Sequence, residues 1–426
     1  MPVAAPDRLR WAGVLVLLLA IGIAYMDRIN VALLITDAPF LHAFGLAGDR
    51  VAQGRLMTLF LLGYGLSAWL LTPLLEARWD VRRGLLASLL LWSGLTFAAA
   101  LSGGILLLLA CRTLLGVAEG PLFSLKTMYV KERFAAAELG KPNAVSSLGV
   151  SLGLGAGYPV VGLLLGWFGW RGSLLSLAAM NLLLGVPLVL AFVRARPPVM
   201  AAAAAVRGDW RGLLLGALRT PHLPLILVIE VCTLSYLWGA STWLPAWLRS
   251  THHLPAEATA LLAGLPFVIG ILATLAGGVL VDALPRRLVP AVFAAGGAAT
   301  AACVTLAILA AQPWLAVLGL LLAGACWGVQ GPAIPTLVQH VAAPGTVGSV
   351  YGVVNGIGNL VAAFMPMLMG AAMTVQGGER IGRGFWLLVG SQGIAALAGL
   401  ALVVVLARRE AGRPHPAPAR AGSIVR

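Results

Sequence analysis

The sequence predicts an all-α polytopic membrane protein in which twelve transmembrane helices form two six-helix bundles. Of the 426 residues, 60% are hydrophobic and only 10% are charged, and the mean hydropathy is +0.94. One soluble core cannot bury such a composition. The apolar stretches are also long and unbroken, whereas a transmembrane barrel shows segments of roughly 10 residues with alternating polarity. The spanning elements are therefore expected to be helices.

The apolar stretches define the expected helices. A helix that crosses a membrane needs about 20 mostly apolar residues. Twelve stretches meet this need, at 11–35, 55–77, 84–101, 103–130, 143–168, 172–193, 223–248, 258–284, 288–311, 313–341, 346–373 and 381–408.

The longest polar connection follows the sixth stretch and divides the chain. We expect four segments: an N-terminal six-helix bundle at 1–193, a cytoplasmic central loop at 194–222, a C-terminal six-helix bundle at 223–408 and a disordered cytoplasmic tail at 409–426. Within the loop, Gly208 to Leu218 carries arginines on one side and Trp210 with leucines on the other. This pattern predicts a short amphipathic helix on the inner membrane surface.

The positive charge has a sidedness that predicts the orientation. The net charge is +14, and most of the 29 lysines and arginines lie in segments on the same side of the membrane as the N-terminus. By the positive-inside rule both termini are cytoplasmic, in a multi-pass protein of the inner membrane. No basic patch is interleaved with exposed aromatic residues, so nucleic acid is not an expected partner.

Charged side chains inside two apolar stretches point to a working site. The first stretch carries the pair Asp27 and Arg28, and the fourth carries Arg112 and Glu119. A charge near the centre of a membrane helix costs about 2.5–3.5 kcal/mol on insertion scales. Their chemistry suggests arginines that hold an anion and carboxylates that carry protons. A purely structural alternative is that the charges neutralise one another and fix helix packing.

The charged residues of the fourth stretch share one helix face. Arg112, Glu119 and Lys126 are seven residues apart, a spacing that drifts by only ~20° per repeat. This face must turn towards the bundle interior or a water-filled cavity. Counting along the helices places Arg28 and Arg112 at comparable depth, near one cavity. Lys126 lies near the inner end of its stretch, where it either joins this face or snorkels to the interface.

The loop after the second stretch of each half recurs. The second copy reads Gly278-x-x-x-Asp282-x-x-x-Arg286-Arg287, and the first reads Pro73-x-x-x-Ala77-Arg78-x-x-x-Arg82-Arg83. With twelve spans and a central loop, this pattern resembles the major facilitator superfamily. The resemblance implies that these loops latch the cytoplasmic side, with Asp282, Arg286 and Arg287 as gating residues. The first copy departs from the pattern at Pro73 and Ala77, where Glu76 is a partial substitute.

A narrower resemblance rests on motifs of single helices. Tyr25-Met-Asp27-Arg28-Ile-Asn30 and Arg112-Thr-Leu-Leu-Gly116-Val-Ala-Glu119 are similar to the first-helix and fourth-helix motifs of the anion:cation symporter family. Thr242-Trp243-Leu-Pro245 and Asn355-Gly-x-Gly-Asn359 add to the likeness. The resemblance implies proton coupling by Asp27 and Glu119 and binding of an organic anion, such as a sugar acid, by Arg28 and Arg112. It also implies that Tyr25, Tyr64 and Asn355 lie near the substrate.

The remaining polar residues of the spans each have two interpretations. Glu230 is either a further proton site or an interface residue hydrogen-bonded across helices. Gln330 lies where Gly and Pro can break the tenth helix and free backbone groups to line a cavity. Trp243 either contacts substrate or belongs to the aromatic belt of the membrane. Tyr25, Tyr64 and Asn355 are substrate hydrogen-bonding groups or packing residues, the last as polar glue between helices.

These observations favour a transporter over other classes. The histidines are scattered at loops and helix ends, and the cysteines have no metal-like spacing, so neither an enzyme nor a cofactor or metal is expected. Protons are the expected coupling ion. The predicted function is symport of a small organic anion with protons by alternating access, by a monomer in the lipid bilayer. The alternative is an organic anion or organophosphate antiporter or exporter of the same fold.

Overall fold

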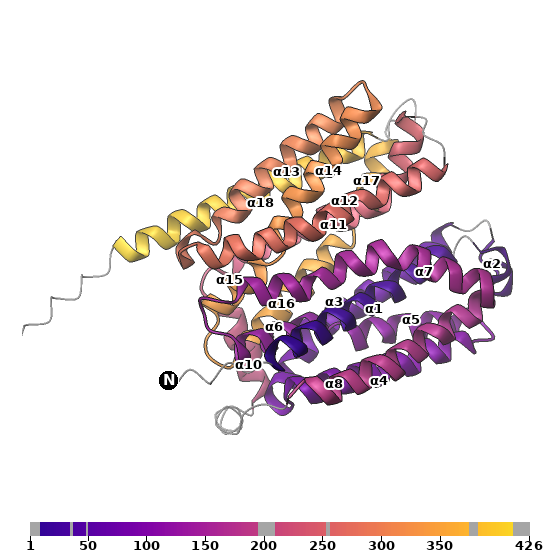
Figure 1. Cartoon of the computed structure of the whole chain (residues 1–426), viewed down its shortest axis with the longest axis horizontal. Helices are drawn as coiled ribbons and strands as arrows, with labels where there is room; N and C mark the ends of the chain where they lie inside the picture. The colour runs from indigo at the N-terminus through magenta and orange to yellow at the C-terminus, as the bar shows by residue number, and fades with distance from the viewer. Residues whose placement is uncertain are drawn as a thin grey trace, which may run out of the picture.

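The computed structural model describes residues 9–34, 37–47, 50–194, 209–252, 256–374 and 382–411 (Figure 1). Most of the expected tail at 409–426 and residues 195–208 of the expected central loop lie outside the described residues. Every regular element in the described ranges is a helix, as expected for an all-α membrane protein.

The helices follow the order of the apolar stretches. Those of the first half are α1 (Leu9–Leu34), α2 (Ala38–Ala43), α3 (Arg50–Arg78), α4 (Val81–Ala100), α5 (Ile105–Glu119), α6 (Leu122–Arg133), α7 (Gly140–Met180), the π-helix η1 (Asn181–Gly185) and α8 (Val186–Phe192). Those that follow are α10 (Trp210–Leu218), α11 (Leu223–His252), α12 (Ala256–Ala283), the 3-10 helix η2 (Arg286–Leu288), α13 (Ala291–Leu309), α14 (Pro313–Gln330), α15 (Ala333–Val341), α16 (Val347–Ala362), α17 (Met365–Thr374) and α18 (Gly382–Ala411).

Eleven stretches of the described helices are long and apolar enough to cross a membrane. The expected fifth and sixth helices are joined in one of them, Val160–Phe192. The residue Gly169 lies inside this stretch with φ 65° and ψ −179°, which is not helical. Its positive φ is a conformation that glycine adopts without strain. The chain turns at Gly169, so α7 and its continuation through η1 and α8 supply both expected passes.

Two of the expected helices are broken at equivalent places. The fourth is divided into α5 and α6 after Glu119, at Gly120-Pro121. The tenth is divided into α14 and α15 after Gln330, at Gly331-Pro332, which confirms the break expected there. Proline lacks the N–H that an uninterrupted helix needs. Glu119 and Gln330 therefore end their helices at matching positions of the two halves.

The two halves meet along two seams and converge at one end. Helix α3 packs against α16, and α7 packs against α12. On the first seam Gly352 and Gly356 of α16 face the backbone of α3 so closely that a Cβ would collide with it; small residues allow this approach between membrane helices. Figure 1 shows the halves together where α6 and α15 lie, and apart towards α2.

The outer surface of the helices is strongly apolar. Leu106, Leu272 and Leu397 expose 81%, 72% and 68% of their surface. A soluble protein does not expose apolar area on this scale, whereas hydrocarbon accepts it. The charged residues of the spans are instead buried between helices. The short helix α10 occupies the place of the expected amphipathic helix, with Leu213 and Ala217 buried and Arg211 exposed.

Candidate functional site

A cavity of about 100 Å³ lies between the two halves. Helices α1, α3, α6 and α7 line it from the first half, and α11 to α16 line it from the second. The residues of the predicted substrate set that line it are Tyr25, Arg28, Tyr64, Gln330 and Asn355. Clefts between helix bundles are common places for small ligands.

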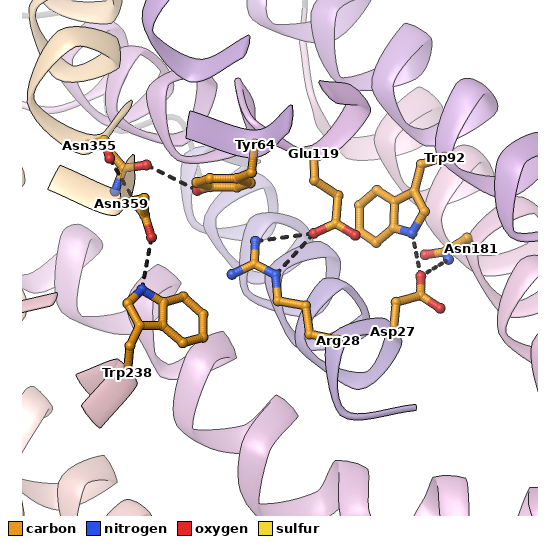
Figure 2. A network of polar contacts seen from close by, with 9 residues as sticks. All are labelled: Asp27, Arg28, Tyr64, Trp92, Glu119, Asn181, Trp238, Asn355 and Asn359. Carbon is orange, nitrogen blue, oxygen red and sulfur yellow. Dashed lines mark hydrogen bonds and ion pairs between the residues drawn. The ribbon is translucent and has the colours of Figure 1, made fainter. Parts of the chain in front are cut away.

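Arg28 and Glu119 form a buried ion pair at the wall of this cavity (Figure 2). Nε and Nη2 of Arg28 donate to one carboxylate oxygen, Oε2 of Glu119, at 3.2 and 3.1 Å. The other oxygen, Oε1, is buried without a hydrogen-bond partner among the described residues. Arg28 lines the cavity, and Glu119 lies behind it. An anion that reached Arg28 from the cavity would compete with Glu119 for the guanidinium.

Three aromatic rings surround the guanidinium of Arg28. Its Cζ atom lies 4.4 Å from the ring centre of Tyr25, 4.8 Å from that of Tyr64 and 5.2 Å from that of Phe60. The negative face of an aromatic ring attracts a cation. These contacts do not involve Glu119, so they position the arginine independently of its ion pair.

Asp27 does not form an ion pair with Arg28, although the two are adjacent in the sequence. It accepts hydrogen bonds from the indole Nε1 of Trp92 and from Nδ2 of Asn181, the latter at 3.0 Å, and it does not line the cavity (Figure 2). Asn181 begins the π-helix η1, a local irregularity that is frequent at functional sites. Neither partner was predicted. The signal for Asn181 was its amide, an unusual group within an apolar span.

Arg112 forms no ion pair with Glu119 or with any other described residue. It is 3% exposed, and its Nε and Nη2 have no hydrogen-bond partner among the described side chains and backbone groups. The carboxylates of Glu119 and Asp27 lie within its electrostatic range, and its Cζ is 5.3 Å from the ring centre of Phe60. The predicted pair of anion-binding arginines is thus divided, because Arg28 lines the cavity and Arg112 does not.

A chain of hydrogen bonds crosses from the first half to the second beside Arg28. The hydroxyl of Tyr64 donates to Oδ1 of Asn355 at 3.0 Å, and Nδ2 of Asn355 donates to Glu230 at 3.3 Å. Nδ2 of Asn359 donates to the backbone oxygen of Asn355, and Trp238 donates to Asn359 (Figure 2). The polar residues of α16 therefore touch both walls of the cavity.

The other polar candidates lie at different places. Gln330 lines the cavity, and its Oε1 is buried without a described partner. Lys126 is completely buried, with Nζ donating to Ser147 at 3.2 Å, so it does not snorkel to the interface. Trp243 does not line the cavity: its indole donates to the backbone oxygen of Pro366 at 2.9 Å in a separate apolar cluster.

At the end where the halves converge, Asp282 connects α12 to α7. Its carboxylate accepts from the backbone N–H groups of Gly140 and Lys141 at 2.6 and 3.1 Å. These residues begin α7 of the opposite half. A carboxylate at a helix N-terminus satisfies N–H groups that lack helical partners and interacts favourably with the helix dipole.

Glu76 makes the equivalent contact on the other seam. It accepts from the backbone N–H of Gly348 at 2.9 Å and of Ser349 at 2.6 Å, and from the Ser349 hydroxyl. These residues begin α16. The role of Glu76 was only partly anticipated as a substitute for the aspartate missing at Ala77. The two carboxylates form a paired latch, each capping a helix of the other half.

Further contacts surround the latch. Nζ of Lys131 and Nδ2 of Asn143 donate to Gln339, each at 2.7 Å, and Gln339 donates to the backbone oxygen of Thr127. The predicted gating residues Arg286 and Arg287 form the exposed turn η2 next to Asp282. Among the described residues no group of three histidine, cysteine, aspartate or glutamate side chains could hold a metal ion.

The comparisons with known proteins identify the family of the chain. The protein-family model described as Major Facilitator Superfamily matches residues 17–366 of this chain. The chain is similar to a hexuronate transporter of Bacillus subtilis (strain 168), with 26% identity over 92% of this chain and 93% of the relative. It is also similar to a probable galactarate/D-glucarate transporter, GudP, of the same organism, with 24% identity over 95% of this chain and 93% of the relative.

Solved structures share the fold at low identity. The proton:xylose symporter XylE superposes with a TM-score of 0.71, covering 95% of this chain and 96% of its own, at 15% identity. At this identity the likeness is evidence for the fold alone.

Proposed function

Because this chain belongs to the major facilitator superfamily, we propose that it is a secondary active transporter that moves a small organic anion of the sugar-acid class together with protons. The superfamily consists of multi-pass membrane transporters, so the protein is a transporter and not an enzyme. The sugar-acid class rests on the names of the relatives and on the arginine in the cavity.

The observation that carries the proposal is the buried Arg28–Glu119 pair at the cavity wall. Arginine offers a planar fork that binds a carboxylate through two hydrogen bonds and keeps its charge. In the empty carrier Glu119 occupies this fork. A proton on Glu119 removes the charge that holds the pair together, and Arg28 then becomes available to the anion. Proton binding and anion binding thereby favour each other.

The transport cycle follows from this competition. In the outward-facing state Glu119 takes up a proton, and the anion binds Arg28 with its hydroxyl groups towards Asn355 and Gln330. The halves then rock, and the anion and proton leave on the cytoplasmic side. The Arg28–Glu119 pair forms again and resets the empty carrier. A ligand shifts such an equilibrium only by its different affinity for the two states.

Asp27 and Arg112 are the second layer of the proposed site. Asp27 remains a proton-coupling residue in this proposal, and Arg112 an anion-binding one. Neither residue lines the cavity. To act in anion binding or proton coupling, they need a movement of α1 against α5, the same movement that breaks the Arg28–Glu119 pair. Arg112 has buried nitrogen atoms without a hydrogen-bond partner among the described residues, which is a reason to expect such a rearrangement.

The paired latch of Asp282 and Glu76 is assigned to one side of the membrane in this cycle. With the N-terminus in the cytoplasm, as the positive-inside rule predicts, Asp282 and Glu76 close the cytoplasmic side. Arg286 and Arg287 would act beside Asp282 in opening this side. We place the protein in the bacterial inner membrane as a monomer, and its proposed cycle needs no cofactor other than the coupling protons.

Uptake into proteoliposomes tests the proposal. A panel of labelled acids, including D-glucuronate, D-galacturonate and galactarate, is offered with and without an inward proton gradient to wild type, Glu119→Gln and Glu138→Gln. The control changes a half-exposed glutamate that pairs with Arg10 outside the cavity. We expect the gradient to drive accumulation in wild type and the control, and Glu119→Gln to accumulate less at the same gradient while it still exchanges internal for external acid.

The outcomes separate the alternatives. Exchange that ignores the gradient in wild type contradicts symport and favours an antiporter or facilitator of the same fold. Paired arginines also suit phosphate, so sugar phosphates belong in the panel. Transport of a phosphate ester without any carboxylate would favour the organophosphate antiporter.

A further inference from the structure

The carboxylate of Glu230 lines the same cavity as Arg28 but belongs to the second half. Glu230 lies in α11 and is 5% exposed. It forms no ion pair with a described residue. Its hydrogen bonds are long, at 3.3 Å from Asn355 and 3.5 Å from Thr233. This carboxylate is therefore buried with weak compensation for its charge.

Among the described residues, one cation lies in electrostatic range of Glu230. This cation is Lys126 of α6, whose Nζ is hydrogen-bonded to Ser147. The other titratable groups of the described residues in its range are the hydroxyls of Tyr25 from α1 and Tyr351 from α16. Helices α14 and α18 present neutral groups to α11: Trp327 donates to the backbone oxygen of Thr233, and Gln392 donates to that of Cys232.

The buried charges in and behind the cavity wall balance one another. Apart from Glu76, which caps α16 at the paired latch, the buried carboxylates of the described residues are Asp27, Glu119 and Glu230, and the buried cations are Arg28, Arg112 and Lys126. A monoanion adds a negative charge to this set. It also enters a small cavity that Glu230 already lines. Like charges in a poorly solvated space repel strongly, and an uncompensated buried charge is costly.

Building on the proposed symport, we propose that Glu230 is a further proton-binding site, which must be neutral while the anion occupies the cavity. A hydronium ion on the outward side gives its proton to the carboxylate and leaves water. The resulting carboxylic acid can donate a hydrogen bond to the substrate. On the cytoplasmic side the acid returns the proton to water after the anion has left. Glu119 and Asp27 are the proposed proton sites of the first half, and Glu230 would be their counterpart in the second.

The proposal has an electrical consequence. Each proton that enters with the anion adds one positive charge to the transported set. A neutral side chain at position 230 cannot bind and release a proton. It nevertheless resembles the protonated Glu230 that the cycle requires while the anion is bound. Glu230→Gln should therefore lower the charge moved per anion by one and leave the coupling through Glu119 in place.

The charge per anion is measured from the membrane potential at which net flux stops. Proteoliposomes with fixed gradients of protons and of an acid that wild type accumulates are clamped at a series of potassium diffusion potentials. The reversal potential depends on the ratio of charges to anions and not on the turnover rate, so slow variants remain readable. The set is wild type, Glu230→Gln, Glu230→Ala as a second neutral variant, Glu230→Asp, which keeps a carboxylate, and Glu138→Gln as the matched control.

We expect Glu230→Gln and Glu230→Ala to move one charge fewer per anion than wild type, and Glu230→Asp and Glu138→Gln to match wild type. An unchanged reversal potential in the neutral variants overturns the proposal. Complete loss of exchange in a neutral variant that elutes as a folded protein overturns it too. Failure of the proposed function is a different result, because wild type itself would then show no response to the proton gradient.

Discussion

Arg28 and its neighbour Asp27 interact with different helices. Consecutive residues of a helix do not face each other. Asp27 therefore turns to Trp92 and Asn181, and Arg28 turns to Glu119 of another helix. The charged residues in the first and fourth apolar stretches indicated which parts of the sequence contribute to the candidate site. The partners could not be predicted, because they depend on which helices pack together.

The same reasoning applies to Arg112 and Glu119. They share a helix face, but seven residues correspond to about 10 Å along the axis, too far for a direct pair. The common face was predicted. Glu119 is used by Arg28 instead, while Arg112 keeps buried nitrogen atoms without a described partner.

At the residue scale, Arg28→Lys tests the proposed anchor. Lysine keeps the charge but loses the planar fork and its stacking between aromatic rings. A hydrogen bond to a charged group contributes about 1.5–3 kcal/mol, so loss of one should weaken binding roughly 10- to 150-fold. The measurement is the affinity for the transported acid by isothermal titration. Arg219→Lys, at an exposed position after α10, serves as control and should match wild type. An unchanged affinity in Arg28→Lys would remove Arg28 from the binding site.

At the scale of elements, helix ends carry the contacts between the halves. Asp282 caps α7 and Glu76 caps α16, each from the opposite half. The loop motif identified Asp282, but its partner lies 142 residues away in sequence. The breaks after Glu119 and Gln330 show the other limit. The glycine and proline after Gln330 predicted the second break. The same Gly-Pro dipeptide follows Glu119, where the helix also ends.

The latch can be tested with Asp282→Asn. A cap of this kind contributes about 0.5–2 kcal/mol, so its loss should increase the fraction of molecules open to the cytoplasm roughly 2- to 30-fold. The readout is the rate at which an impermeant maleimide, applied to the cytoplasmic side, modifies a cysteine placed at Ser147 after the four native cysteines are replaced. Asp209→Asn is the control, because Asp209 caps α10 within its own segment.

Glu76→Asn should act in the same direction as Asp282→Asn, and the double variant should open further. Equal labelling rates in wild type and the double variant would show that these carboxylates do not hold the cytoplasmic side closed.

At the scale of the whole molecule, composition and hydropathy predicted the membrane class and the order of the helices. The turn at Gly169 is the main difference, because one helical run there supplies two expected passes. The cavity between the halves could not be located from one sequence. Its lining combines residues of α1 and α3 with those of α11, α14 and α16, and contacts over such separations depend on packing.

For the whole molecule to couple anion transport to protons, anion binding at Arg28 must drive proton uptake at Glu119. The most direct test adds the transported acid, adjusted to the pH of the sample, to weakly buffered purified protein and records the pH. We expect wild type and Glu138→Gln to take up protons as the anion binds, and Glu119→Gln to take up about one proton fewer per anion, as linkage requires. Binding without any proton uptake in wild type, or uptake that is unchanged in Glu119→Gln, would contradict the account.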